Sequence, residues 1–319
     1  MSADKTTDAR NIDLGPGKEF DIVRAFLSEW GNSAQHIGDD AAIVEVPAGE
    51  KLVITTDTSV DGVHFRHEWL NHFEIGYRAT AAALSDLAAM AARPLGVVIA
   101  LTLPEADRVE ARALATGIRE GASAVLCPIL GGDLSSGKTL SLTITALGSV
   151  ARPLSRAGAK PGQRVYVTGS LGGPAAAVRA WLAGQEPTER DRERFANPIP
   201  RIEPAVGLAQ RGATSAIDIS DGLIADLGHV AAASKVCIEI DVDRIPRVDG
   251  VSALEAANSG EEYEIVATAP AIDVEAFAEE FGLSLTEIGR VVAGPSGVEL
   301  QSGGKRISAP PGFDHFRDK

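Results

Sequence analysis

Cysteine is nearly absent from this 319-residue sequence, which contains only Cys127 and Cys237. Neither has a second cysteine or a histidine at the spacing of a metal site. Both lie in apolar, strand-like segments. We therefore expect buried free thiols in a protein of the reducing cytoplasm.

Positive charge and long apolar runs are also scarce. The 30 Lys and Arg residues against 44 Asp and Glu give a net charge of −14, which disfavours binding to nucleic acid but does not exclude a nucleotide that arrives with magnesium. The most apolar region, residues 79–103, contains Asp86, Arg93 and Pro94, so no membrane span is predicted. Residues 1–17 lack the apolar segment of a secretory signal and are predicted to form a flexible arm.

Hydrophobic periodicity predicts mixed helices and strands in both halves of the chain, an α/β fold with mixed α+β layers. The predicted helices cover residues 20–30, 73–92, 105–121, 172–183, 223–233 and 274–281. The predicted strands cover residues 42–46, 51–55, 95–103, 124–130, 139–150, 164–168, 214–217, 236–242, 263–267 and 286–292. Prolines and glycines at residues 152–162 break the periodicity and predict a boundary between domains 18–151 and 152–319. Residues 185–200 are predicted to form a charged connector.

Short aspartate-containing segments occur where apolar elements meet a break or a small residue. The two most acidic are residues 38–40 (Gly-Asp-Asp) and 218–222 (Asp-Ile-Ser-Asp-Gly), in opposite halves. Residues 55–57, 85–86 and 131–133 follow the same pattern. Converging carboxylates repel one another unless cations bind, so the pattern predicts a divalent-metal and polyphosphate site. Each segment could instead be a turn or a helix N-cap, where Asp is also favoured.

One motif points to a different nucleotide site and is rejected. Residues 132–139 fit the P-loop pattern G-x-x-x-x-G-K-T after an apolar strand. A P-loop needs a helix that begins at the Lys-Thr pair, because the helix N-terminus helps to hold the phosphates. The next residues, 140–145, alternate as a β-strand does. Lys138 is therefore predicted to be an exposed turn residue, while the amides near Gly132 could still approach a phosphate, with Asp133 on a metal.

Taken in order along the chain, the motifs resemble those of the thiamine-monophosphate kinase family. Besides the aspartate segments, they include residues 62–65 (Gly-Val-His-Phe), 84–90, 155–162, 260–264 and 312–316. The resemblance runs from about Glu19 to Phe316. It implies a two-domain fold like that of aminoimidazole-ribonucleotide synthetase, with N-terminal strands that form a homodimer and a C-terminal α/β domain.

The resemblance also implies an activity: Mg2+-dependent, in-line transfer of a phosphoryl group from ATP to thiamine monophosphate, giving thiamine diphosphate and ADP. It implies catalytic roles for Asp86, Asp133 and Asp218. The implied metal ligands are Asp39, Thr55, Thr56, Asp57, Asp86, Asp133, Asp218 and Asp221. The implied ATP contacts are Gly132, Asp133, Arg156 and Ser220, and the implied contacts to thiamine monophosphate are His64, Glu261 and Phe313.

Several of these residues have a simpler interpretation. His64 could be a satisfied core histidine, Arg156 a surface cation, and Phe313 an anchor for the C-terminal tail. Asp40 and Asp226 are interpreted as turn or helix-face residues.

The chain also departs from the family pattern. Residues 259–264 read Ser-Gly-Glu-Glu-Tyr-Glu where Gly-Gly-Glu-Asp-Tyr-Glu is usual, and residues 134–137 read Leu-Ser-Ser-Gly where Thr-Thr-Arg-Gly is usual. The second change removes a hydroxyl and a cation near the expected ATP phosphates. Two alternatives therefore stay open: another ATP-using enzyme of the same superfamily, and a catalytically weakened sensor of thiamine phosphates or nucleotide. A selenophosphate synthetase or a hydrogenase-maturation enzyme would need a cysteine near one end of the chain, where this sequence has none.

Overall fold

The computed structural model describes residues 16–35 and 37–308, and these form two compact units. The first unit contains residues up to Leu84 together with residues 94–149. The second contains residues 85–93 and the chain from Val150 onward. The chain thus enters the second unit twice, first for one short segment and then for the remainder.

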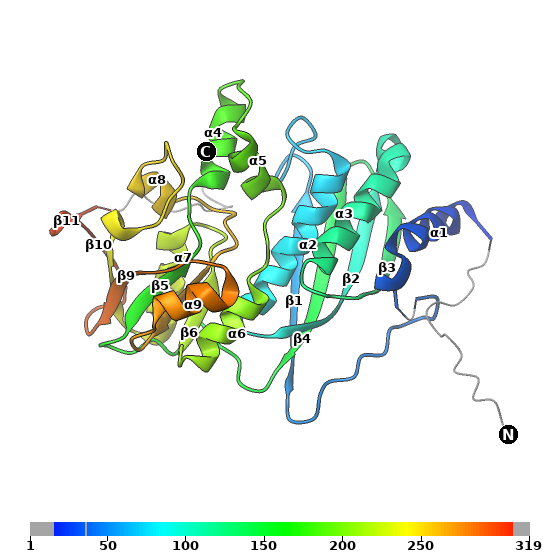
Figure 1. The fold of residues 1–319 in the computed structure, drawn as a ribbon. Helices are drawn as coiled ribbons and strands as arrows, with labels where there is room; N and C mark the ends of the chain where they lie inside the picture. Colours follow the sequence, from blue (N-terminus) through cyan, green and yellow to red (C-terminus); the bar gives the residue numbers. More distant parts are fainter. Residues whose placement is uncertain (1–15, 36, 309–319) are drawn as a thin grey trace. The chain divides into compact units, whose positions relative to one another are not determined.

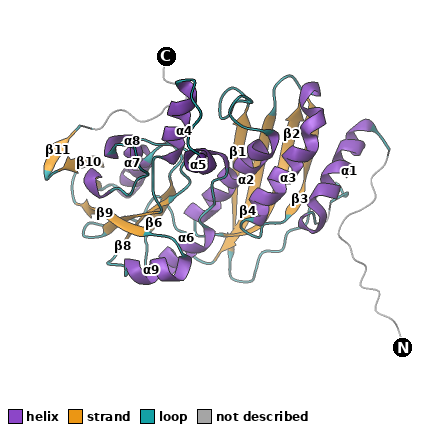
Figure 2. Cartoon of the chain, turned by 45° about the horizontal axis from the view of Figure 1, so that its top comes forward, coloured by secondary structure: helices purple, strands orange, loops and turns teal. Residues whose placement is uncertain are grey.

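The first unit is a four-stranded sheet with helices on one face (Figures 1 and 2). The strand order is β1 (Lys51–Val60), β4 (Ser141–Val150), β2 (Arg93–Leu103), β3 (Ile129–Ser136), and β2 and β3 are parallel. Helices α2 (His72–Ala89) and α3 (Ala111–Ser123) cover the sheet. They approach so closely that a Cβ at Gly117 would lie 1.9 Å from the carbonyl oxygen of Phe73, so this position requires glycine.

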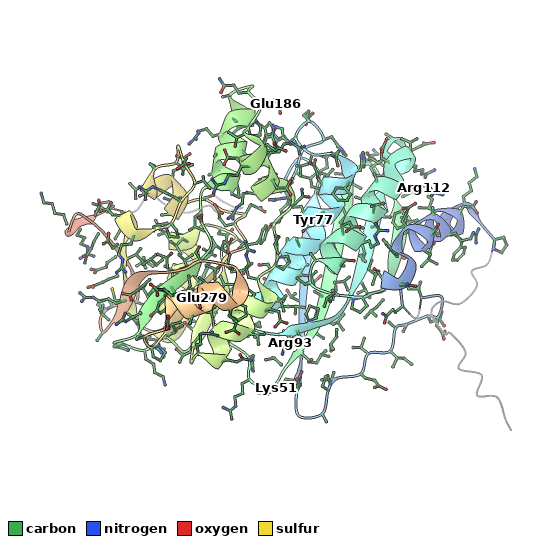
Figure 3. All side chains as sticks on the ribbon, in the orientation of Figure 1. Lys51, Tyr77, Arg93, Arg112, Glu186 and Glu279 are labelled. Carbon is green, nitrogen blue, oxygen red and sulfur yellow. The ribbon has the colours of Figure 1, made fainter. Side chains whose placement is uncertain are left out.

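Helix α1 (Lys18–Trp30) packs on α3. The indole of Trp30 donates a hydrogen bond to the carbonyl of Ala115 (3.0 Å), and Arg112, labelled in Figure 3, forms an ion pair with Glu29 (2.9 Å). A buried Trp needs such a partner for its N–H, so these contacts fix how α1 lies on the unit.

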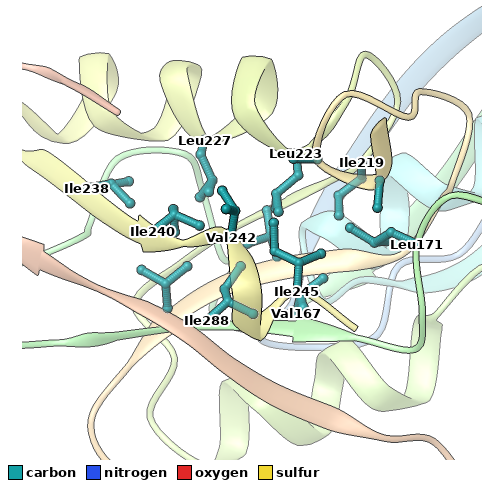
Figure 4. Close-up of a cluster of buried hydrophobic side chains, with 14 of the residues drawn as sticks. Val167, Leu171, Ile219, Leu223, Leu227, Ile238, Ile240, Val242, Ile245 and Ile288 are labelled. Carbon is teal, nitrogen blue, oxygen red and sulfur yellow. The ribbon is translucent and has the colours of Figure 1, made fainter. Parts of the chain in front are cut away.

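The second unit is a seven-stranded mixed sheet. The strand order is β11 (Lys305–Ile307), β10 (Gly297–Ser302), β7 (Cys237–Asp241), β9 (Leu285–Val292), β5 (Arg164–Thr168), β8 (Ile265–Ala269), β6 (Ser215–Asp218). Only the β10–β7 pairing is parallel among those in this sheet. Helix α7 (Leu223–Ser234) packs Leu223 and Leu227 onto Ile238, Ile240 and Ile288 of the strands (Figure 4). The further helices are α4 (Gly173–Leu182), α5 (Glu189–Ala196), α6 (Ile202–Gln210), α8 (Ala253–Ala257) and α9 (Val274–Phe281).

Most predicted elements are confirmed, with small shifts at their ends, and β5 and α9 have the predicted bounds. Two strand predictions are wrong. Residues 42–46 form no strand, and residues 124–128 lie between α3 and β3. The predicted connector contains α5, whose N-cap Thr188 accepts a hydrogen bond from the amide of Asp191 (3.1 Å). Helices α6 and α8, strands β10 and β11, and the short 3-10 helices η1 (Gly31–Ser33) and η3 (Val242–Arg244) were not predicted. The helix predicted over residues 105–121 begins as the 3-10 helix η2 (Glu105–Glu110) and continues as α3.

Both cysteines are buried and free, as expected. Among the described residues, no helix has the length and apolar character needed to cross a membrane.

Candidate active site

The tightest arrangement of predicted site residues is the aspartate loop, residues 218–222, which connects β6 to α7. One carboxylate oxygen of Asp226, in the first turn of α7, accepts hydrogen bonds from the amides of Ser220, Asp221 and Gly222, each at 3.1 Å. Asp226 does lie on a helix face, as interpreted from the sequence. Its side chain also holds the whole loop in one conformation.

Asp218 lies at the start of this loop and is 5% exposed. The Ser85 hydroxyl donates a hydrogen bond to its carboxylate (2.8 Å). Burial, followed by the charge of Asp86, raises the pKa of Asp218 to about 7, although the bond from Ser85 and the charge of Arg156 lower it. Burial and the charges of Asp218 and Asp221 raise the pKa of Asp226 to about 7 as well. The cluster therefore favours a bound proton or cation near neutral pH.

Arg156 acts on this cluster through its charge, from the segment at which the chain re-enters the second unit. The amide of Ala216 on β6 donates to the carbonyl of Ser155 (3.2 Å), and the hydroxyl of Ser234 on α7 donates to the carbonyl of Arg156 (2.9 Å). The Arg156 residue is exposed, while its charge acts on Asp218. An exposed guanidinium beside buried carboxylates is suited to contact a phosphate group.

The glutamate loop, residues 259–264, pairs with the aspartate loop through backbone hydrogen bonds. The amide of Glu261 donates to the carbonyl of Ser220 (2.7 Å), and the amide of Tyr263 donates to that of Ile219 (2.9 Å). Glu261 and Tyr263 have φ values of 61° and 54°, a left-handed conformation that is strained for residues other than glycine. The Tyr263 hydroxyl donates to the Glu261 carboxylate (2.6 Å). Glu261 is thus held next to the aspartate loop, with its side chain oriented.

A buried ionic network underlies the glutamate loop and was missed from the sequence. Arg201 donates two hydrogen bonds to Glu264 (3.0 and 2.6 Å), and the Thr168 hydroxyl donates a third (2.6 Å). Arg194 bridges Glu262 (3.0 Å) and Glu264 (3.4 Å). Burial raises the pKa of Glu262 to about 7, although Arg194 lowers it. A signal was present: two glutamates beside an apolar strand must find cations if they are buried.

The predicted site residues of the first unit are more exposed. Asp39 and Asp133 are exposed, and their carboxylates lie close to neighbours in the chain, Asp39 to the amide of Asp40 (3.0 Å) and Asp133 to the hydroxyl of Ser135 (3.4 Å). His64 is partly buried, and its ring nitrogen accepts a hydrogen bond from the amide of Val60 (3.2 Å).

On β1, strand alternation places Thr55 and Asp57 on one face and Thr56 on the other. The Thr56 hydroxyl lies 3.1 Å from that of Thr145 on β4. The side chains of these three predicted metal ligands therefore do not share one face.

Gly132 and Asp133 lie on β3, and the P-loop is absent, as predicted. A Cβ at Gly132 would lie 1.9 Å from the carbonyl oxygen of Ile99, so glycine is needed for β3 to pair with β2. The chain beyond Lys138 continues as β4, with no helix at the Lys-Thr pair, and Lys138 is exposed. Asp133 borders a pocket lined mainly by apolar residues of α1 and β2, among them Phe26, Trp30 and Ile99.

The donor set fits Mg2+. Asp86, Asp218 and Asp221 offer carboxylate oxygens, the ligands that hard divalent cations prefer, and ionised Asp218 gains a partner for its charge when a cation binds. Asp221 and Asp226 also have ligand atoms within 4.8 Å of one another and of His229. Phe313 lies outside the described residues.

Comparison with known proteins first defines the class. The family described as AIR synthase related protein, N-terminal domain, matches residues 38–150, and AIR synthase related protein, C-terminal domain, matches residues 160–300. These matches cover both units, so the protein has the two-domain fold of this superfamily.

Individual relatives narrow the class to one family. The chain is 36% identical to thiamine-monophosphate kinase of Salmonella typhimurium over 93% of its own length and 98% of the relative's. The crystal structure of thiamine-monophosphate kinase from Stenotrophomonas maltophilia superposes with a TM-score of 0.79, at 36% identity, covering 92% of this chain and 98% of that one. A structure described as AaThiL complexed with AMPPCP and TMP has a TM-score of 0.73 at 30% identity, covering 96% and 100%. The chain belongs to the thiamine-monophosphate kinase family.

Proposed function

We propose that this protein is a thiamine-phosphate kinase, which transfers the γ-phosphoryl group of ATP to thiamine monophosphate and releases thiamine diphosphate and ADP. The observation that carries the proposal is the pairing of the aspartate loop with the glutamate loop, which places Asp218, Ser220 and Glu261 together. The family match supports the choice of substrates, since a relative of this fold is described in complex with an ATP analogue and TMP.

The chemistry asks the protein mainly to position two anions and neutralise their charge. Bound Mg2+ would supply that neutralisation between the nucleotide and the acceptor phosphate. In the second unit, Asp86, Asp218 and Asp221 would hold the metal, Arg156 and Ser220 would contact ATP, and Glu261 would contact thiamine monophosphate. Asp226, Ser85 and Tyr263 would position these groups.

The predicted site residues of the first unit have proposed roles of their own. Asp39, Thr55, Thr56, Asp57 and Asp133 would bind metal. Gly132 would bind ATP and His64 the thiamine phosphate, as would Phe313. Asp86, Asp133 and Asp218 would carry the catalytic charge stabilisation.

The proposed mechanism is direct in-line transfer without a phosphoenzyme, which the acceptor can support as the nucleophile. A phosphate monoester has its second pKa near 6, so the attacking oxygen is already ionised at neutral pH and needs no general base. Incubation with γ-labelled ATP and Mg2+ in the absence of thiamine monophosphate should leave the protein unlabelled.

We also propose a homodimer in the cytoplasm. Leu52 and Ile54, on one face of β1, are 44% and 60% exposed, which suits a strand face covered by a second copy. The free thiols Cys127 and Cys237 suit a reducing compartment. Light scattering coupled to size exclusion should give twice the 33.2 kDa chain mass, and Ile54→Lys should lower it.

The decisive experiment incubates the purified protein with ATP, Mg2+ and thiamine monophosphate and follows thiamine diphosphate by chromatography. Metal-dependent product, absent from a control with EDTA, is the expected result. Binding of ATP or thiamine monophosphate without turnover would favour the sensor alternative. No thiamine diphosphate, together with thiamine-independent ATP hydrolysis, would favour another acceptor within the superfamily.

A further inference from the structure

A second group of metal-ligating side chains lies in the first unit, apart from the predicted Mg2+ ligands. It consists of His67, His72 and Asp107, whose ligand atoms all lie within 4.8 Å of one another. The Nε2 atom of His72 is 2.8 Å from Oδ1 of Asp107, and Nε2 of His67 is 3.8 Å from the same oxygen. Asp61 lies next to this group, with its Oδ2 3.7 Å from Nε2 of His67.

We infer that these residues form a site for a borderline divalent transition metal, Zn2+ by its ligand chemistry. Zinc binds imidazole nitrogen and carboxylate oxygen at about 2.0–2.2 Å in tetrahedral geometry, which places neighbouring ligand atoms about 3.3 Å apart. The separations from Asp107 Oδ1 to the two ring nitrogens, 2.8 and 3.8 Å, bracket that value. Imidazole ligands favour Zn2+ over Mg2+, which binds oxygen donors.

Three separate segments bring Asp61, His72 and Asp107 together, and backbone hydrogen bonds anchor Asp61 and Asp107. Asp61 follows β1, and its amide donates to the carbonyl of Leu140 (3.0 Å). His72 is the first residue of α2, and Asp107 lies in η2, where its amide donates to the carbonyl of Pro104 (3.1 Å). Ligands held on fixed backbone lose less conformational entropy when a metal binds.

The burial of the group suits a bound ion with limited access to water. The side chains of His72 and Asp107 are 16% and 13% exposed, whereas those of His67 and Asp61 are 34% and 32% exposed. The two imidazole rings lie with their centroids 5.1 Å apart and their planes inclined at 41°, and the Nε2 atoms of both are within 4 Å of Oδ1 of Asp107. A metal at this point would join the turn after β1, which carries His64, to α2 and η2. The bound ion would therefore cross-link these three segments of the first unit.

The test is a titration of the metal-free protein with Co2+, in the presence of millimolar Mg2+ to occupy the carboxylate sites. We expect one equivalent of Co2+ to give visible ligand-field absorption, Zn2+ to displace it, and bound Zn2+ to raise the melting temperature. His67→Gln and His72→Gln should each weaken Zn2+ affinity by at least 10-fold, as loss of one ligand does, and Asp107→Asn should do the same.

His229→Gln is the matched control, because His229 lies beside Asp221 and Asp226 in the second unit. Melting curves without metal establish that each variant is folded. The inference is overturned if the wild type binds no Co2+ or Zn2+ below about 100 µM, or if the absorption is lost in His229→Gln and retained in His67→Gln. Retention in His229→Gln with loss in both His67→Gln and His72→Gln supports it.

Discussion

The aspartates of the two units are held in opposite ways. In the second unit, Asp218 and Asp226 are 5% and 1% exposed. The carboxylate of Asp226 accepts hydrogen bonds from three backbone amides. In the first unit, Asp39 and Asp133 are exposed, and their carboxylates accept hydrogen bonds from Asp40 and Ser135, one and two residues away in the chain. A buried carboxylate loses hydration and requires a cation, whereas an exposed one keeps its water until a ligand displaces it.

This difference separates two contributions to one proposed reaction. In the second unit, the carboxylates are already buried close together without a ligand. This burial destabilises their ionised forms and raises the pKa values of Asp218 and Asp226. In the first unit, Asp39 and Asp133 are exposed, so their ionised forms are not destabilised by burial. Substitutions in the second unit should therefore change both stability and turnover, while those in the first should change turnover alone.

The largest expected effect is the loss of turnover in Asp86→Asn and Asp218→Asn. Each removes a carboxylate proposed to hold Mg2+, and we expect kcat to fall by at least about 10²–10³-fold. Asp218→Asn should also stabilise the metal-free protein at pH 8 by roughly 1–2 kcal/mol, because a buried charge is removed while the Ser85 hydroxyl keeps an oxygen acceptor.

Two control variants sharpen that result. Asp39→Asn should lower kcat but leave the unfolding free energy within about 0.5 kcal/mol, since its side chain is exposed. Asp249→Asn, at an exposed position outside the proposed site, should change neither. Steady-state kinetics and urea unfolding provide the measurements. Full activity in Asp86→Asn would remove that residue from the proposed mechanism.

Asp226→Ala tests whether the aspartate loop is held by one side chain. The change leaves the amides of Ser220, Asp221 and Gly222 without their acceptor, so we expect a loss of about 2–4 kcal/mol in urea unfolding and a fall in kcat of about 10–100-fold. Glu275→Ala removes an exposed acid from the first turn of α9 and should have little effect. Equal stability in the two variants would mean that the loop holds its shape without Asp226.

Glu264→Gln probes the ionic network below the glutamate loop. It leaves the guanidinium groups of Arg201 and Arg194 without their shared carboxylate, and we expect a loss of about 3 kcal/mol. Glu255→Gln breaks the more exposed ion pair with Arg179 and should cost at most about 1 kcal/mol. If the two variants unfold at the same urea concentration, the buried network contributes no more than a surface pair.

The pH dependence of stability should differ with and without Mg2+. The pKa values of Asp218 and Asp226 are raised from 3.8 to about 7 and that of Glu262 from 4.5 to about 7, so the folded protein binds more protons than the unfolded chain between about pH 4 and pH 7. Stability of the metal-free protein should therefore fall as pH rises through this range, by roughly 1–3 kcal/mol. Mg2+ binds the ionised form, so its stabilisation should grow with pH.

Melting curves at pH 5.5 and pH 8, with EDTA or with Mg2+, measure this dependence. Asp218→Asn should flatten the metal-free profile, while Asp39→Asn should leave it unchanged. A metal-free protein that becomes more stable toward pH 8 would contradict the assigned pKa shifts.

The sequence predicted those parts of the site whose signal is local. Asp218 and Asp221 stand out because they follow an apolar strand and precede a helix. The Ser85 hydroxyl contacts Asp218 across 133 positions of sequence, and Glu264 contacts Arg201 across 63, and no local pattern encodes such pairs. Residues such as Asp218 can be predicted from their neighbours in the chain, whereas pairs such as Ser85 and Asp218 become visible only in the folded structure.

The same reason accounts for the elements that were mispredicted. Residues 42–46 have strand-like composition, but a strand also needs a pairing partner, and Ile43 is 85% exposed in the described first unit. Helix α5 is highly charged, and its buried residues Phe195 and Ala196 lie at its end, so no apolar period marked it. Propensity therefore missed α5, whose start is fixed by the Thr188 cap.

The smallest expected effect is that of Lys138→Ala. This variant tests whether the first unit binds nucleotide through a P-loop lysine or without it, through the backbone near Gly132. A P-loop lysine contacts the phosphates, and its loss would weaken catalysis by orders of magnitude. Lys138 is exposed and is followed by β4, so kcat and the KM for ATP should each change by less than about twofold, with stability within about 0.5 kcal/mol. Arg156→Ala is the matched loss of a cation in the second unit and should raise the KM for ATP about tenfold. A large rise in the KM for ATP in Lys138→Ala, with no rise in Arg156→Ala, would contradict this prediction. It would assign phosphate binding to the exposed turn of the first unit instead of to Arg156 of the second unit.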